Sequence, residues 1–181
     1  MGRLRADAER SMRAIMAAAE EVLSANPVAT MEQIAESAGV ARATVHRRFA
    51  SREALIEAME VAAWREIQEA VHAARPHTAP ALVALHQATA NILQIKPGWR
   101  FTLAREVPLS HEAQAVRAEV MELCESVFGK LLGPGADIVW ARQAYLALLG
   151  EAAHGSPPGF DADALATRVL DTLMYGVQRT A

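Results

Sequence analysis

Apolar residues recur at helical spacing along almost the whole 181-residue chain. In the first such run Met12, Ile15, Met16, Ala19 and Val22 fall on one face of a helix from about residue 6 to residue 24. No segment shows the period-two alternation of a half-buried β-strand. The sequence therefore predicts an all-α fold.

Clusters of Gly and Pro separate these runs, and residues 75–80, Arg-Pro-His-Thr-Ala-Pro, form the strongest internal break. The composition is 52% hydrophobic and 22% charged, which is typical of a soluble globular protein. The predicted helices cover residues 6–24, 30–37, 41–49, 51–71, 81–94, 99–105, 110–132, 137–154 and 161–179, each bound being approximate.

Two of the predicted helices are short and lie on either side of Gly39. The first begins with a capping box, in which the Thr30 hydroxyl accepts from the Gln33 backbone N–H and the Gln33 side chain accepts from the Thr30 N–H. The second places Val45 and Phe49 four residues apart on its inner face. Two short helices joined by a tight glycine turn predict a helix-turn-helix.

Positive charge is concentrated at this motif. The chain carries a net charge of −3, yet no Asp or Glu lies between Glu36 and Glu53. That interval contains Arg42, Arg47, Arg48 and Arg52. Cations away from carboxylates suit a polyanion, because neutralising phosphates supplies much of the affinity for DNA.

The run Thr30 to Leu55 resembles the DNA-binding region of the tetracycline-repressor (TetR) family. The family pattern there is Ile-Ala-x-x-Ala-Gly-Val-Ser, then Gly-Thr-x-Tyr-x-His-Phe, then Ser-Lys-Glu-x-Leu. The chain reads TMEQIAESAGVARATVHRRFASREAL. The resemblance is specific over about 50 N-terminal residues, and beyond them only the helical architecture matches. It implies a three-helix head at residues 1–55, and a helical-bundle body for ligand binding and dimerisation at residues 56–181.

The resemblance implies a role for each matching position. Thr44 and Arg52 would hold phosphates, and His46 occupies the position of a Tyr that touches DNA. Ala43 replaces a Gly that eases close backbone approach, and Arg48 replaces a His. Arg42 and Arg47 are the candidates for base readout, because Arg can grip guanine O6 and N7 with two hydrogen bonds. The predicted DNA-binding set is Thr30, Arg42, Ala43, Thr44, His46, Arg47, Arg48 and Arg52.

Simpler interpretations stay open for several of these residues. An Arg-rich helix is often only a solvated face. Thr30 has sufficient reason to be present as a cap, with or without a phosphate contact. His46 could instead be a partly buried structural residue.

The last two predicted helices are more apolar than a surface helix needs. The helix at residues 137–154 carries apolar side chains almost all round, and such a helix must be buried on every side. The final helix also has a broad apolar face. Two such helices from each of two chains would form a four-helix bundle, and the resemblance implies the same homodimer. Its symmetry would place two recognition helices about 34–36 Å apart on DNA.

A small-molecule effector is expected among the middle helices, as the resemblance implies. A mixed aromatic and polar wall is what such a site needs. Plain core packing explains any single candidate equally well. The candidate ligand-binding residues are His86, Trp99, Phe101, Arg105, Met121, Cys124, Trp140 and Tyr145.

The sequence shows no catalytic, metal or cofactor motif. The His residues are scattered without metal-site spacing, and no Gly-rich phosphate loop occurs. A single cysteine, Cys124, gives no disulfide framework, and no signal pattern or membrane-length apolar run appears. We therefore expect a cytoplasmic protein that is not an enzyme and has no cofactor.

The favoured function is a DNA-binding transcriptional regulator, a repressor released from its operator by a small molecule. Two alternatives remain. One is a DNA-binding protein without ligand response, such as an activator or nucleoid-type binder. The other is an all-helical ligand-binding adaptor or enzyme that has lost DNA binding.

Overall fold

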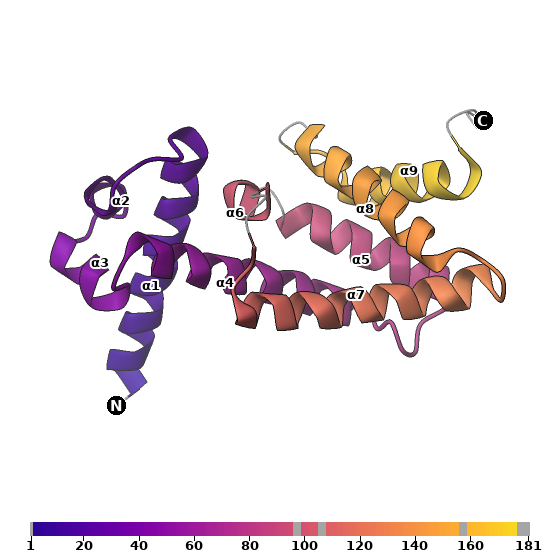
Figure 1. The fold of residues 1–181 in the computed structure, drawn as a ribbon, viewed down its shortest axis with the longest axis horizontal. Helices are drawn as coiled ribbons and strands as arrows, with labels where there is room; N and C mark the ends of the chain where they lie inside the picture. Colours follow the sequence, from indigo (N-terminus) through magenta and orange to yellow (C-terminus); the bar gives the residue numbers. More distant parts are fainter. Residues whose placement is uncertain (1, 96–98, 105–107, 156–158, 177–181) are drawn as a thin grey trace. The chain divides into compact units, whose positions relative to one another are not determined.

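The computed structural model describes residues 2–95, 99–104, 108–155 and 159–176. These residues form α-helices joined by turns and contain no β-strand (Figure 1). The predicted all-α fold is confirmed. The helices are α1 (Gly2–Ala25), α2 (Met31–Ser37), α3 (Arg42–Arg48), α4 (Arg52–Ala73), α5 (Ala81–Ile95), α6 (Arg100–Ala104), α7 (His111–Leu132), α8 (Ile138–Gly155) and α9 (Ala162–Tyr175).

Most helix ends lie within two residues of their predicted places. The largest differences are at the two ends of the chain, where α1 begins at Gly2 and α9 ends at Tyr175. Gly176 stops α9 because it adopts a φ of +79° while its N–H still donates to the Thr172 carbonyl. The predicted end of this helix near residue 179 was therefore too late, and residues 177–181 lie outside the described part of the chain.

The chain packs as two compact units. The head unit contains residues Met1–Ala63 and Gly98–Ala113, and the body unit contains Trp64–Pro97 and Gln114–Ala181. The head unit thus includes a segment distant in sequence from the expected 1–55 domain. The functional boundary after residue 55 stays a prediction.

One hydrophobic core holds the head unit together. Helix α1 packs against α2 and α6, and α2 packs against α3. Trp99 belongs to the core of α1–α4 although it lies far from those helices in sequence. The fully buried members with large side chains are Ile15, Leu23, Ile34, Val45, Leu55 and Met59.

Two buried carboxylates attach the 98–113 segment to the rest of the head unit. The Glu20 carboxylate is 6% exposed and accepts hydrogen bonds from the Phe101 N–H, the Thr102 N–H and the Thr102 hydroxyl. Glu60, on α4, is 4% exposed and accepts from the Ser110 N–H at 3.3 Å. Buried charges of this kind need such partners, so both contacts fix the segment in place.

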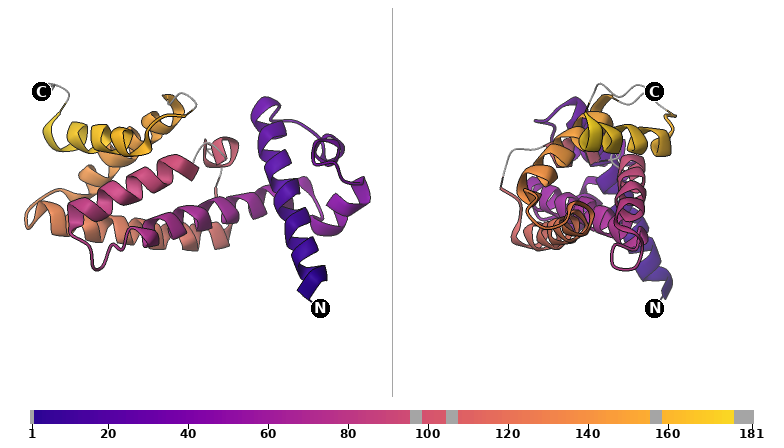
Figure 2. Two further views of the ribbon diagram at one scale, coloured as in Figure 1. Left: turned by 180° about the vertical axis from the view of Figure 1, so that it is seen from behind. Right: turned by 90° about the vertical axis from the view of Figure 1, so that its right-hand side faces the viewer.

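In the body unit, α9 packs against both α5 and α8 (Figure 2). The buried Tyr145 hydroxyl lies 2.9 Å from the Thr89 hydroxyl, and the Tyr145 ring meets Phe128 edge-on at 5.6 Å. Only Tyr145 and Leu149 of α8 are buried, whereas Val139 and Trp140 are exposed. A single chain therefore does not cover α8 on every side.

Candidate nucleic-acid interface

Helix α2 begins with the capping box that the sequence predicts. The Gln33 N–H donates to the Thr30 hydroxyl at 3.4 Å, and the Thr30 N–H donates to the Gln33 side chain at 2.8 Å. Ile34 and Ala35 are buried on the inner face of the helix. The box fixes where α2 starts, and the buried pair fixes which side faces the core.

A glycine turn then leads into α3. Gly39 has a φ of +64°, a conformation that side-chain-bearing residues rarely adopt. The Val40 N–H donates to the Ala35 carbonyl at 3.0 Å and closes the turn. On α3, Val45 is 0% exposed, and Phe49 just after the helix is 5% exposed. These two anchors turn the opposite face of α3 toward solvent.

That outward face presents together the predicted DNA-binding residues that belong to α3, which exclude Thr30 and Arg52. Thr44 is half-buried, and the others on this helix are exposed. No Asp or Glu belongs to α3. The face can offer guanidinium and imidazole donors to an anionic surface, and the exposed members are Arg42, Ala43, His46, Arg47 and Arg48.

The fold nevertheless brings a carboxylate to Arg42. The Arg42 Nη2 lies 2.6 Å from the Glu32 Oε1, and the Arg42 Nε donates to the His46 Nε2 at 3.4 Å. The expectation that all four arginines stand apart from carboxylates is therefore wrong for Arg42. Counting acids between residues 36 and 53 missed Glu32, because the turn at Gly39 folds α2 back beside α3.

Arg52 has an internal role that the sequence did not indicate. Its Nε donates to the Ala29 carbonyl at 3.1 Å, and its Nη2 donates to the Pro27 carbonyl. These bonds tie the start of α4 to the turn between α1 and α2. The predicted phosphate contacts of Arg52 and Thr30 stay predictions, and part of each side chain is already engaged within the head unit.

Comparisons with known proteins agree with this geometry. Residues 15–59 match the family described as bacterial regulatory proteins, tetR family. The HTH-type transcriptional repressor LfrR of Mycolicibacterium smegmatis is 26% identical over 175 residues, covering 93% of this chain and 91% of LfrR.

The chain carries the N-terminal domain of TetR-family regulators.

Solved structures of TetR-family and other regulators share its fold. LfrR from Mycobacterium smegmatis in complex with proflavine aligns at 24% identity and a TM-score of 0.70, covering 95% of this chain and 99% of that one. PfmR, a TetR-family regulator from Thermus thermophilus, aligns at 18% identity and a TM-score of 0.77, with 91% and 99% covered. FadR from Bacillus subtilis in complex with stearoyl-CoA aligns at 20% identity and a TM-score of 0.69, with 91% and 98% covered.

The family match lies wholly within the head unit. It runs from Ile15 of α1 to Met59 of α4, both of which are fully buried in the head core. The matched residues include the whole exposed α3 face. Its homologues are transcriptional regulators.

The structure separates the predicted ligand-binding residues of this chain. Trp99 is buried in the head core and Phe101 packs against it. Arg105 lies outside the described residues. The remaining five belong to the body unit and are His86, Met121, Cys124, Trp140 and Tyr145.

Those five differ in exposure. Trp140 is 66% exposed, so within one chain it forms no interior wall. Tyr145 is buried, and Cys124 and Met121 are partly buried on α7. Burial raises the pKa of the Cys124 thiol to about 12. His86 Nε2 lies 3.0 Å from the Thr167 hydroxyl of α9.

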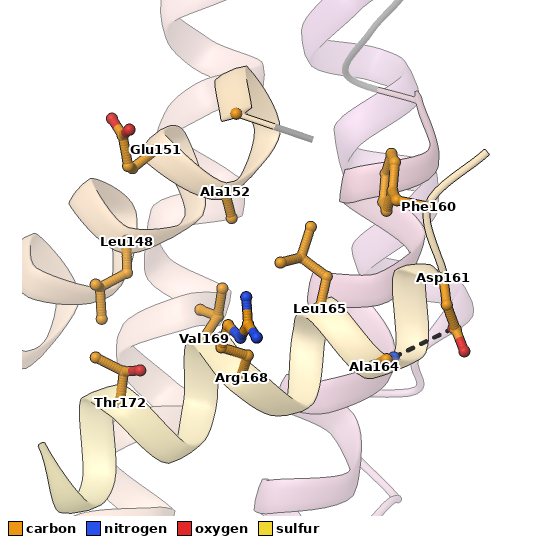
Figure 3. Close-up of a pocket in the computed structure, with 11 residues that line it drawn as sticks. Leu148, Glu151, Ala152, Phe160, Asp161, Ala164, Leu165, Arg168, Val169 and Thr172 are labelled. Atoms are coloured by element: carbon orange, nitrogen blue, oxygen red, sulfur yellow. Dashed lines mark hydrogen bonds between the residues drawn. The ribbon is translucent and has the colours of Figure 1, made fainter. Parts of the chain in front are cut away.

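A pocket of about 550 Å³ lies between α8 and α9 (Figure 3). Leu148 and Ala152 line it from α8, and Leu165 and Val169 from α9. Sequence reasoning predicted that these helices have wide apolar faces but did not identify this pocket. Charged groups at this pocket are Glu151, Asp161 and Arg168.

In the described parts of the chain, none of the helices has both the length and the hydropathy to cross a membrane. No group of three or more His, Cys, Asp or Glu side chains among those residues is arranged to hold a metal ion.

Proposed function

We propose that the chain is a repressor that binds operator DNA as a homodimer and leaves it when a small molecule binds the body unit. One observation carries the proposal. Helix α3 buries Val45 beside Phe49 and exposes Arg42, His46 and Arg47 on its other side. A short helix with this division can lie in the major groove with its cations toward DNA.

The roles on DNA follow from donor geometry. Arg42 and Arg47 read base edges, because a guanidinium can donate two parallel hydrogen bonds to guanine. Thr44 and Arg48 contact phosphates. Ala43, where the family has Gly, shifts the docking of the α3 backbone slightly, and His46 contacts the DNA backbone or bases. Thr30 and Arg52 contribute phosphate contacts beside their roles in the head unit.

The dimer forms through α8 and α9. The α8–α9 pocket and the exposed Val139 and Trp140 leave apolar surface on these helices that one chain does not cover. Large contiguous apolar patches on soluble proteins mark interaction sites. A two-fold axis between two such faces would give two α3 helices per dimer, as a palindromic operator requires.

The effector binds within the body unit. The polar groups of the body unit include Thr89, Tyr145 and Cys124, which lie on its helices. LfrR has been solved with proflavine and FadR with stearoyl-CoA, so two proteins of this fold hold organic ligands. The candidates to test in this unit are His86, Met121, Cys124, Trp140 and Tyr145. Of the other predicted residues, Trp99 belongs to the head core, Phe101 packs against it, and Arg105 lies outside the described residues.

The protein acts in the cytoplasm, where the chromosome is, and catalyses no reaction. Ligand binding would shift the population between a DNA-competent and a DNA-incompetent arrangement, and only differential affinity for the two can do so.

The test selects duplexes that bind the full-length chain from a randomised library. The wild type is expected to enrich a palindromic sequence. The double variant Arg42→Ala and Arg47→Ala is expected to bind it at least about a hundredfold more weakly, with an unchanged circular dichroism melting curve. Equal affinity of the two proteins would reject the proposal. Proflavine and stearoyl-CoA serve as the first probes of release from that duplex, by fluorescence anisotropy.

A further inference from the structure

Arg42 stands at the first position of α3, where a recognition helix meets base edges. Its side chain is 66% exposed, and that of its partner Glu32 is 45% exposed. An ion pair this open to water contributes little to folding stability. Its consequence lies instead in how it orients the guanidinium.

A guanidinium has five N–H hydrogens in a fixed planar fork. The Nε of Arg42 points to His46 at 3.4 Å, and Nη2 points to Glu32 at 2.6 Å. These two nitrogens form the side edge of the guanidinium, which is thus occupied by the protein. The end edge, formed by Nη1 and the second hydrogen of Nη2, keeps two parallel donors for another acceptor.

Glu32 is itself held in place. Its pKa is lowered because the carboxylate accepts from its own backbone N–H and from the Thr30 hydroxyl, and Arg42 and His46 add a smaller attraction. Thr30 is fixed in turn by the capping box of α2. A chain of contacts therefore runs from the start of α2 to the guanidinium on α3.

We propose that Glu32 is a specificity-determining positioning residue, which together with His46 fixes the Arg42 guanidinium so that its end edge reads one guanine in each half-site. This rests on the proposed function, since it requires that α3 contacts bases. The two end-edge donors match guanine O6 and N7, the pair of acceptors in the major groove that a bidentate Arg selects.

The opposite role for Glu32 would be competition. A carboxylate beside Arg42 could simply weaken its attraction to phosphate, in which case removing Glu32 would strengthen binding to every DNA sequence. Positioning and competition therefore give different results. Positioning changes the preference at one base pair, and competition changes affinity uniformly.

The experiment uses the full-length protein and the duplex selected for the wild type. Each base pair of a half-site is replaced in turn, and affinity is measured by fluorescence anisotropy at one fixed salt concentration. The variants are Arg42→Ala, Glu32→Ala, the two combined, and Glu32→Lys. Glu36→Ala is the matched control, because it removes one exposed carboxylate from the same helix α2.

The expected result concerns a single base pair. Arg42→Ala loses discrimination there, and Glu32→Ala lowers discrimination at the same base pair by about fivefold or more, while the other positions keep theirs. Glu32→Lys lowers it further because two cations repel. In the Arg42→Ala background, Glu32→Ala has no additional effect on discrimination. Glu36→Ala leaves discrimination unchanged.

Two results would overturn the inference alone. One is a Glu32→Ala protein that discriminates as the wild type does, and the other is a uniform change in affinity equal to that of Glu36→Ala. Melting curves measured by circular dichroism show whether each variant is folded. A wild type that selects no sequence would instead reject the proposed function, and this inference with it.

Discussion

An Arg–Glu pair joins neighbouring helices in each unit, but the two pairs differ in how much water surrounds them. In the head unit, Arg42 and Glu32 have side chains that are 66% and 45% exposed. In the body unit, Arg142 of α8 pairs with Glu125 of α7, and their side chains are 24% and 42% exposed. The Arg142 Nε is buried without a hydrogen-bond partner among the described residues.

The difference indicates two uses of the same chemistry. The exposed pair lets Arg42 keep Glu32 while the free end edge of its guanidinium exchanges water for a new acceptor at low cost, which suits a surface that binds DNA. The half-buried pair cannot, because a guanidinium that loses its carboxylate there remains partly desolvated. We therefore expect the head pair to govern recognition and the body pair to govern stability.

The largest expected effect tests how far water is excluded from the surroundings of the body pair, Arg142 and Glu125. Cys124 adjoins Glu125 in sequence, and burial raises its pKa to about 12. Since the thiolate is the reactive form, labelling by a disulfide reagent at pH 8 should be about a thousandfold slower in the folded protein than in urea. The measurement is the labelling rate followed by absorbance. Folded and unfolded rates within tenfold of each other would show that water reaches this side of α7.

The second effect extends the comparison to a carboxylate with almost no exposure. Glu20→Ala removes the acceptor of two backbone N–H groups and of the Thr102 hydroxyl, and leaves the two Thr102 donors buried and the Phe101 N–H partly buried. We expect a loss of about 2–4 kcal/mol in the free energy of unfolding. Urea titration measures it, with the exposed neighbour Glu21→Ala as the control. A loss no greater than that of the control would mean that the hydrogen bonds of Glu20 contribute nothing to the free energy of unfolding.

The third prediction concerns the body pair itself. Glu125→Ala should lower the free energy of unfolding by about 1–2 kcal/mol, less than for a fully buried pair because water screens part of Glu125. The control is Glu122→Ala, an exposed acid on the same helix. Equal urea midpoints for the two variants would show that the body pair, like the head pair, adds nothing to stability beyond an exposed acid.

A fourth and smaller effect is expected at Arg52. Lys in its place cannot reach the Ala29 and Pro27 carbonyls with a planar fork, so we expect a loss of about 1 kcal/mol in stability. This corresponds to a melting temperature lower by about 2–4 °C. Arg48→Lys, on exposed α3, should leave the melting temperature unchanged. A similar shift in both would show that the carbonyl contacts of Arg52 are not what matters.

The smallest effect on stability is expected at the head pair. Glu32→Ala should change the free energy of unfolding by less than about 0.5 kcal/mol, since the pair is exposed. Thermal melting of this variant beside Glu36→Ala provides the measurement. A loss above about 1 kcal/mol would make the pair structural and would bring it close to Glu125 and Arg142.

Local patterns were enough to predict most of the fold. Helical spacing located the helices that the structure describes, and turn chemistry located most of their ends, because both depend on residues close in sequence. The capping box at Thr30 and the inward pair Val45 and Phe49 belong to this class, and the structure confirms them.

Contacts between distant residues escaped prediction. Glu20 and Thr102 are 82 positions apart, and nothing near either residue signals the contact. The pairing of Glu32 with Arg42 depends on the fold of the turn between α2 and α3. The α8–α9 pocket depends on the angle at which two helices meet, and apolar spacing does not encode that angle.

The hydrogen bonds between Glu20 and the 98–113 segment have a practical consequence for chimeric regulators. A designer who transplants residues 1–63 onto another body would leave behind Trp99, which completes the head core, and the three donors that satisfy Glu20. The transplanted head would have a cavity in place of Trp99 and a buried Glu20 carboxylate without its hydrogen-bond donors. The transferable module is discontinuous and must include residues 98–113, or a replacement for both Trp99 and the start of α6.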